Sequence, residues 1–144
     1  MLKDYLNELT ASYGLLYIKL HQFHWYVKGS SFFTLHEKFE ELYDGTTEDL
    51  DLVAERLLQI GGNPVSTLGE FIQYSWIKEA PYTAEIAPID MVKTIKADYE
   101  LLNYKLTDGL DIAKEEDDEV TIDMIIGFKT GIEKTLWMLN AYLA

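Results

Sequence analysis

Residues 21–62 read HQFHWYVKGSSFFTLHEKFEELYDGTTEDLDLVAERLLQIGG. All three histidines of the 144-residue chain lie in this stretch, as His21, His24 and His36. A pair of carboxylates, Asp51 and Glu55, follows at the spacing of one helical turn. Imidazole and carboxylate groups together suit divalent iron, zinc or manganese. The alternative is an ordinary helical hairpin that carries a few polar residues.

The apolar pattern predicts two long helices around this stretch. Residues 3–28 carry apolar side chains at steps of three and four, which is typical of an amphipathic helix. Glycine and serine at 29–31 end that pattern. Thr34 and Glu37 match a capping box, so we expect the second helix to begin near Leu35. Glycine and proline at 61–64 then end it.

The second half of the chain predicts another helical pair. Residues 64–87 are irregular, with a short helix expected within 67–75. Pro88 suits the first turn of a third helix, which we expect to reach about Ala113. A fourth helix follows the acidic run 115–119. Gly127 and Gly131 in that helix lie one turn apart, and we expect them to allow a close helix contact.

Two helical pairs joined by a long connection indicate the fold class. They predict an all-α protein, with one ferritin-like four-helix bundle over residues 1–144 and a short extra helix in the central connection. A chain of 144 residues is long enough to bury a substantial core. Its apolar fraction of 48% and aromatic fraction of 13% are those of a folded globular protein.

The composition of the chain excludes several classes of function. There are 12 basic and 25 acidic residues, for a formal net charge of −13. This charge opposes bulk electrostatic binding of a polyanion and attracts cations. The chain has no cysteine, which excludes thiolate metal sites and cysteine nucleophiles. It has neither an apolar run of the ~20 residues that span a bilayer nor the pattern of a secretory signal, so we expect a cytoplasmic protein without a membrane segment.

Spacing along the second helix limits where a metal could bind. An acidic stripe runs along it, and a solvated charged surface is the commonest reason for such a stripe. His36 and Asp51 are 15 residues apart, or ~22 Å along a helix, so one chain cannot place both on the same ion. His24 and His36 flank the turn, and an antiparallel hairpin brings them to the same level. Two arrangements remain open. The histidine pair and the carboxylate pair could serve separate purposes, or they could form one site shared between two chains.

An intrabundle di-iron site is disfavoured. Such sites use Glu-x-x-His motifs on two helices. The residues three positions before the histidines are Ile18, His21 and Phe33, so the motif does not occur.

The chain resembles the Dps mini-ferritins over nearly its whole length. The residues that carry this resemblance are HxxHW at 21–25, FFTLHEKF at 32–39, DLVAERLLQIGGNP at 51–64, STLGEF at 66–71, EAPYT at 79–83 and the late Trp137. It is most similar to the bacterial branch that stores iron without binding DNA.

The resemblance implies a cage of twelve subunits with di-iron ferroxidase centres at two-fold interfaces. By position, His24 and His36 would be ligands from one chain, and Asp51 and Glu55 ligands from its neighbour. Glu40 matches an acidic position that holds a second, weaker iron. The implied reaction oxidises Fe(II) to Fe(III), preferably with hydrogen peroxide, and stores the mineral inside the cage. Zinc or manganese would be competitors.

Other positions have a weaker implied role. Trp25 and Trp137 resemble tryptophans that flank the site and intercept oxidising equivalents, although aromatic packing explains them equally well. His21 has no ligand role in the family, and we expect a structural or hydrogen-bonding histidine.

The acidic run resembles the lining of the family's three-fold entry pores. Asp123 and then Glu119 are the expected pore residues, and Asp117 or Asp118 could cap the following helix.

DNA binding is the main competing function. In this family it is associated with mobile basic tails. Here only Lys3 precedes Lys19, and the last ten residues hold no basic side chain. With the net charge of −13, we expect weak DNA binding at physiological salt. A third reading is a bundle whose polar hairpin only mediates dimerisation.

Overall fold

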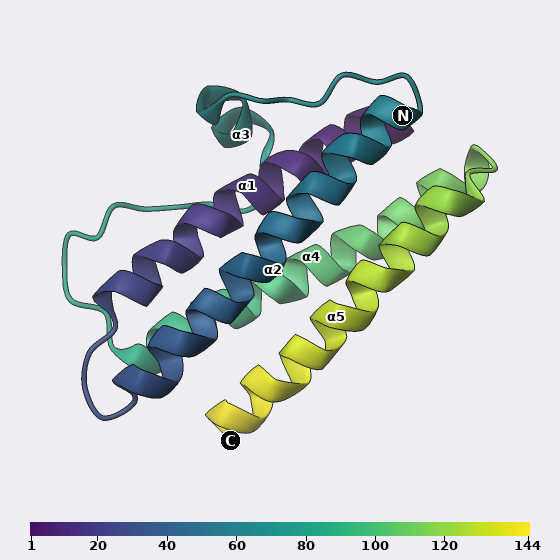
Figure 1. Cartoon of the computed structure of the whole chain (residues 1–144). Helices are drawn as coiled ribbons and strands as arrows, with labels where there is room; N and C mark the ends of the chain where they lie inside the picture. The colour runs from purple at the N-terminus through teal and green to yellow at the C-terminus, as the bar shows by residue number, and fades with distance from the viewer.

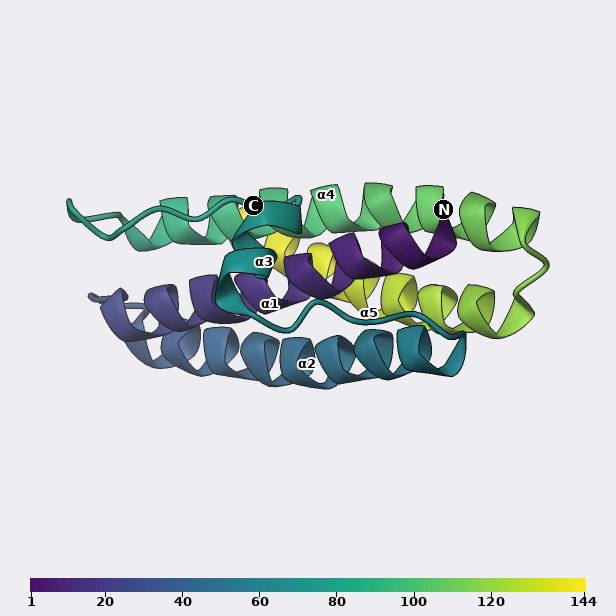
Figure 2. The same cartoon turned by 90° about the horizontal axis from the view of Figure 1, so that it is seen from above.

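The computed structural model describes residues 1–144 and contains helices only. Its elements are α1 (Leu2–Tyr26), α2 (Phe32–Gln59), α3 (Leu68–Tyr74), α4 (Pro88–Glu115) and α5 (Glu119–Leu143). Two antiparallel pairs, α1 with α2 and α4 with α5, form a four-helix bundle, and α3 lies against α1 (Figures 1 and 2). The all-α prediction and the short extra helix are therefore confirmed.

The long connection between α2 and α4 runs the length of the bundle. Because α2 and α4 point the same way, the chain must return to the opposite end before α4 can begin (Figure 1). The core is one cluster of 27 buried apolar residues drawn from all four long helices and the connection. None of the helices combines the length and the apolar character needed to cross a membrane.

The predicted start of the second helix was wrong. It begins at Phe32 rather than near Leu35, and its N-cap, Ser31, makes no side-chain capping hydrogen bond. Leu35 N already bonds to the carbonyl of Ser31, so the helix has begun before Thr34, and Thr34 cannot be its cap. A reciprocal cap does occur at α3, where Thr67 Oγ1 accepts from Glu70 N at 3.2 Å and Glu70 Oε1 accepts from Ser66 N at 3.2 Å.

The expected close contact at Gly127 and Gly131 was also wrong. A Cβ at either position would meet nothing within 4 Å, so neither glycine touches a neighbouring helix. The tight approaches are elsewhere. A Cβ on Gly14 would meet the Phe71 ring at 2.5 Å, and one on Gly109 would overlap the Tyr5 ring.

Two polar links fix the helices relative to one another. Lys19 Nζ on α1 pairs with Asp98 Oδ2 on α4 at 2.7 Å and also donates to the carbonyl of Lys78 at 2.7 Å, so it ties α1 to α4 and to the connection. Burial raises the pKa of Asp98, while Lys19 acts to lower it.

At the other end of the bundle, Asp118 caps α5. It accepts hydrogen bonds from Thr121 N at 3.0 Å and from Arg56 Nη2 of α2 at 2.7 Å. The prediction of a cap at Asp117 or Asp118 is thus confirmed for Asp118.

Candidate metal centre

His24 and His36 lie side by side where α1 and α2 meet at their common end. Their rings stack at a centroid distance of 3.7 Å, although twelve residues separate them in the chain. His24 Nδ1 is 2.6 Å from the carbonyl oxygen of His36, and His36 Nδ1 is 2.7 Å from the carbonyl oxygen of His24. Each imidazole is therefore held by the backbone of the other residue.

These hydrogen bonds decide which ring nitrogen can bind a metal. A carbonyl oxygen only accepts, so Nδ1 must donate in both histidines. In the neutral imidazoles, Nε2 then carries the free lone pair. Second hydrogen bonds of this kind orient the histidines of metal sites and raise their basicity. The pair is thus prepared to offer two Nε2 ligands.

Glu40 is the one carboxylate that this chain brings to the histidine pair. Its Oε1 is 3.9 Å from His24 Nε2 and accepts a hydrogen bond from the Tyr43 hydroxyl at 3.2 Å. Desolvation and then the bond to Glu40 raise the pKa of Tyr43, so the phenol remains a donor at neutral pH. Glu40 stands one turn after His36 on α2, which is why the two can face the same ion.

Asp51 and Glu55 lie farther along α2, exposed and one turn apart. Neither takes part in a hydrogen bond or an ion pair within the chain. The ~22 Å rise between His36 and Asp51 keeps the carboxylate pair away from the histidine pair. No three histidine or acidic side chains of a single chain converge in a way that could hold a metal ion.

Aromatic rings surround the histidine pair. His21 stacks on Tyr43 at 3.6 Å and its Nδ1 donates to the carbonyl of Tyr17 at 2.7 Å. Trp25 lies 5.3 Å from the His21 ring and is 63% exposed, while Trp137 on α5 is 67% exposed and has no aromatic contact. The hydrogen-bonding role expected for His21 matches this geometry.

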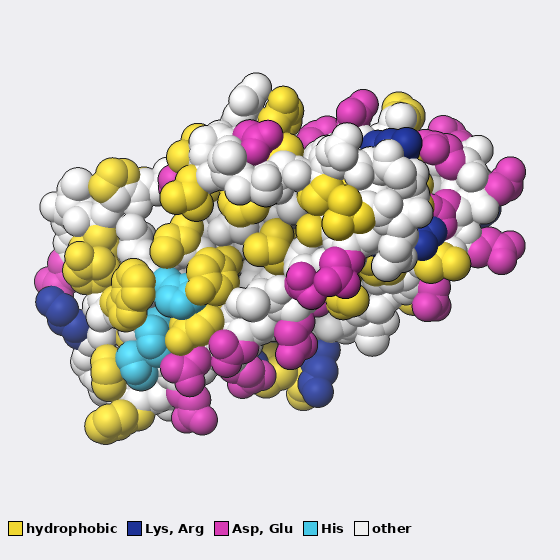
Figure 3. Space-filling view, turned by 45° about the horizontal axis from the view of Figure 1, so that its top comes forward, with side chains coloured by type: hydrophobic (Ala, Val, Ile, Leu, Met, Phe, Trp, Pro, Cys, Tyr) yellow, Lys and Arg dark blue, Asp and Glu magenta, His cyan; other side chains and the backbone are white.

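Apolar side chains are exposed around the site. Figure 3 shows the histidines set among hydrophobic side chains, with acidic side chains alongside. A half-open cavity of about 470 Å³ lies between α1, α2 and α3, and its lining is mostly apolar, including Ile18, Leu68 and Ile72. Leu68 is 80% exposed. Exposed apolar surface of this kind is typical of sites that bind another molecule.

The acidic residues near the start of α5 are exposed. Glu119 occupies the first position of α5, and Asp123 follows one turn later. Asp123 lines a cavity between α2 and α5 together with Arg56. Their role in a pore stays a prediction.

Sequence reasoning missed the contribution of Tyr43, Tyr17 and Phe32. Tyr43 falls within the apolar pattern of its helix, yet its hydroxyl donates to Glu40 Oε1 at 3.2 Å. Phe32 stacks on His36 at 4.8 Å. The spacing of Tyr43, three residues after Glu40, would have placed the two side chains on one surface of the helix.

The chain was compared with known proteins. A family model for a ferritin-like domain matches residues 3–144. The chain is 49% identical to "DNA protection during starvation protein 2" of Bacillus anthracis, with 97% of this chain and 94% of the relative covered. It is 43% identical to the "DNA protection during starvation protein" of Listeria innocua, over 98% and 90% of the two chains.

Solved structures agree with these relatives. The structure of Dps from Listeria innocua superposes with a TM-score of 0.97 at 43% identity, covering 99% of this chain and 93% of the other. That of a Dps protein from Bacillus brevis superposes with a TM-score of 0.95 at 44% identity, covering 99% and 95%. The fold, the full-length coverage and the identity agree, and the chain belongs to the Dps family of ferritin-like proteins.

Proposed function

We propose that this protein oxidises Fe(II) to Fe(III) and stores the product, at di-iron centres shared between two chains. His24 and His36 of one chain, with Asp51 and Glu55 of its neighbour, would bind the first iron. Glu40 would bind the second, weaker iron. Iron is here the substrate and the cargo.

The observation that supports this proposal most directly is the reciprocal histidine pair. Its two Nε2 atoms are free and fixed, yet one chain adds only Glu40 near them. The missing carboxylates are exposed and unpaired on the same helix, beside an apolar surface that a second copy could cover. In a two-fold dimer, the histidine pair of each chain would meet the carboxylate pair of the other chain, which gives two complete sites.

The ligand set suits the chemistry. Imidazole binds Fe(II) well and carboxylate oxygen favours Fe(III), so a mixed set holds iron in both states. Two Fe(II) ions give up one electron each, and hydrogen peroxide with two protons takes both electrons and leaves as two waters. Because both electrons move at one centre, no hydroxyl radical is released. Trp25 and Trp137 would intercept stray oxidising equivalents.

The assembly that follows from this proposal is a cytoplasmic cage of twelve chains, each a single ferritin-like domain over residues 1–144. Asp123 and Glu119 would line its entry pores, where their charge concentrates cations. Zinc and manganese would compete for the iron ligands.

Subunit mixing tests the shared site. One variant carries His24→Ala and His36→Ala, and the other carries Asp51→Ala and Glu55→Ala. Each alone should lose fast oxidation of Fe(II) by peroxide. In a mixed dimer one site has all four ligands and the other has none, so random mixing should restore about a quarter of the wild-type sites.

The control is a mixture in which both chains lack the same two ligands, and it should stay inactive. If the His24/His36 variant mixed with the Asp51/Glu55 variant also stays inactive, while dimers form, the shared site is wrong. Full activity of the Asp51/Glu55 variant on its own would show that these two carboxylates are not iron ligands.

DNA protection is the second candidate, because it is the function printed in the names of the relatives. The net charge of −13 argues against tight direct binding at physiological salt. A gel-shift assay at low and at physiological salt distinguishes DNA binding from iron oxidation without DNA binding. Tight binding that persists at the higher salt would favour a DNA-coating protein.

A further inference from the structure

A second cavity lies among the four long helices, away from the histidine pair. It has a volume of about 190 Å³ and is half open. Residues with hydroxyl or carboxyl groups line it from all four long helices: Tyr13, Glu41, Thr46, Asp49, Tyr99 and Thr135. Gly45 and Gly131 leave space beside these groups, since a Cβ on either would touch nothing within 4 Å.

Tyr13 presents an unused hydroxyl to this cavity. Its side chain is only 1% exposed, and the hydroxyl has no hydrogen-bond partner in the chain. Buried polar groups are almost always hydrogen-bonded, and leaving one unsatisfied at such depth is destabilising, so this hydroxyl calls for a bound species that supplies the missing interaction.

Two acidic residues, Glu41 and Asp49, line the cavity. Glu41 is exposed and pairs with Lys38 at 3.2 Å, whereas Asp49 has no basic partner. It makes no ion pair or hydrogen bond, and no lysine or arginine lines the cavity. Arg56, which lines a neighbouring cavity together with Asp49, is already bonded to Asp118, Thr121 and Gln59. Asp49 is half-buried on α2. A cation beside this carboxylate would remove the cost of burying it unpaired.

We propose that this cavity binds one hydrated divalent cation of the Mg²⁺ and Mn²⁺ class, with Asp49 as its carboxylate ligand. Such ions take oxygen ligands, keep several of their waters and use one or two carboxylates. The volume holds about six molecules of water at ~30 Å³ each. The hydroxyls of Tyr13 and Thr46 hydrogen-bond the waters of the ion. Because the ligands are all oxygen, the site differs in preference from the histidine pair.

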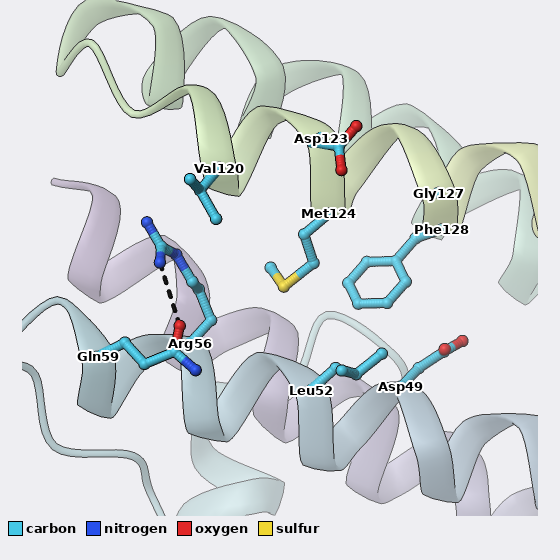
Figure 4. A pocket seen from close by; sticks show the side chains of 9 residues that line it. All are labelled: Asp49, Leu52, Arg56, Gln59, Val120, Asp123, Met124, Gly127 and Phe128. Carbon is cyan, nitrogen blue, oxygen red and sulfur yellow. Dashed lines mark hydrogen bonds between the residues drawn. The ribbon is translucent and has the colours of Figure 1, made fainter.

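A path leads to Asp49 from the α2–α5 side. Asp49 also lines a neighbouring cavity of about 530 Å³, which holds Asp123 on α5. Figure 4 shows Met124 and Phe128 pointing from α5 toward Leu52 of α2 across this space. Asp49 therefore borders both cavities, and the acidic Asp123 stands on the rim of the wider one.

Manganese binding tests the site on the assembled protein. The loss of the electron paramagnetic resonance signal of free Mn²⁺ counts the bound ions, in a background that carries Asp51→Ala and Glu55→Ala. We expect about one Mn²⁺ per chain to remain there. Adding Asp49→Asn should abolish it, whereas adding Glu48→Gln, an exposed neighbour with the same change of charge, should leave it.

Equal Mn²⁺ binding with and without Asp49→Asn would overturn the proposal, as would the absence of bound Mn²⁺ in the background. A wild-type crystal soaked in Mn²⁺ gives a second readout that needs no variant. An anomalous peak beside Asp49 is expected, and density without anomalous signal would mean that only water fills the cavity. Neither result depends on whether the histidine pair binds iron.

Discussion

Tyr43 controls how Glu40 faces the histidine pair. Its hydroxyl donates to Glu40 Oε1 at 3.2 Å, and its ring stacks on His21. Tyr43→Phe keeps the ring and removes only this hydrogen bond. If Glu40 holds the second ion, we expect the affinity of that ion to fall about 5- to 10-fold, because a bond to a charged group contributes about 1 kcal/mol or more. The first ion should bind as before.

Zinc titration calorimetry measures both steps without oxidation. Phe33→Leu, an exposed change in the same helix turn as His36 that touches none of the proposed ligands, is the control. If Tyr43→Phe leaves both zinc affinities unchanged, Tyr43 does not position Glu40.

Asp118 gives the chain a pH-dependent link between α2 and α5. Burial acts to raise its pKa, but the hydrogen bonds from Thr121 and Arg56 outweigh burial and hold the pKa of Asp118 below its ordinary value. A lowered pKa in the folded state stabilises the protein above the unfolded pKa of about 4 and ceases to do so as the pH falls through the folded value.

We therefore expect Asp118→Asn to lower the free energy of unfolding by about 1–2 kcal/mol at pH 7, since asparagine still caps the helix but loses the charge that Arg56 bonds. The difference from wild type should shrink below pH 4. Thermal unfolding followed by circular dichroism from pH 3 to 7 measures it. A difference that grows on acidification would refute this account.

At the scale of elements, close packing of α1 against α4 depends on Gly109. A Cβ there would overlap the ring of Tyr5, whose hydroxyl donates to the carbonyl of Lys105 at 2.8 Å. We expect Gly109→Ala to destabilise the protein by about 1–3 kcal/mol, as overpacking a core does. Gly127→Ala is the matched control, because nothing lies within 4 Å of its Cβ, and it should stabilise α5 by about 0.5–1 kcal/mol.

Chemical denaturation of both variants separates steric from helix-propensity effects. If Gly109→Ala and Gly127→Ala change stability in the same direction, the close approach at Gly109 is not what requires glycine there.

The contrast between these glycines shows what sequence could predict. The spacing of the apolar residues, the glycine-rich turn and Pro88 predicted the bounds of every helix to within a few residues. These features are local properties of the chain. Local pattern was wrong at two positions. It predicted a helix cap at Thr34, which lies inside α2, and a close helix contact at Gly127, where a Cβ would meet nothing within 4 Å. A glycine's neighbours depend on how distant helices approach, and no local pattern records that.

The candidate site was predictable to a similar degree. The turn between His24 and His36 already required the two imidazoles to meet. The reciprocal bonds to each other's carbonyls were not predictable, because they depend on ring rotation after packing. The ring of Tyr43 gives no sign in the sequence that its hydroxyl reaches Glu40, and only the folded helix shows this bond.

For the whole molecule, activity should depend on contact between copies. The apolar surface around α3 exposes Leu68 and Ile72, and neither is needed for the fold of one chain. Placing a charge in an apolar interface costs several kcal/mol when it is buried unpaired. We expect Leu68→Asp with Ile72→Asp to give a folded monomer that has lost rapid Fe(II) oxidation, although every proposed ligand is present.

Sedimentation velocity, circular dichroism and peroxide-driven iron oxidation on the same sample test this dependence. The control is Ile89→Asp, another exposed apolar residue, in the first turn of α4 and outside the surface around α3. An active monomer would show that one chain completes the iron site. That result would contradict the shared site inferred from the ~22 Å between His36 and Asp51 along α2. An inactive monomer that still stacks His24 on His36 would show that assembly supplies the missing carboxylates.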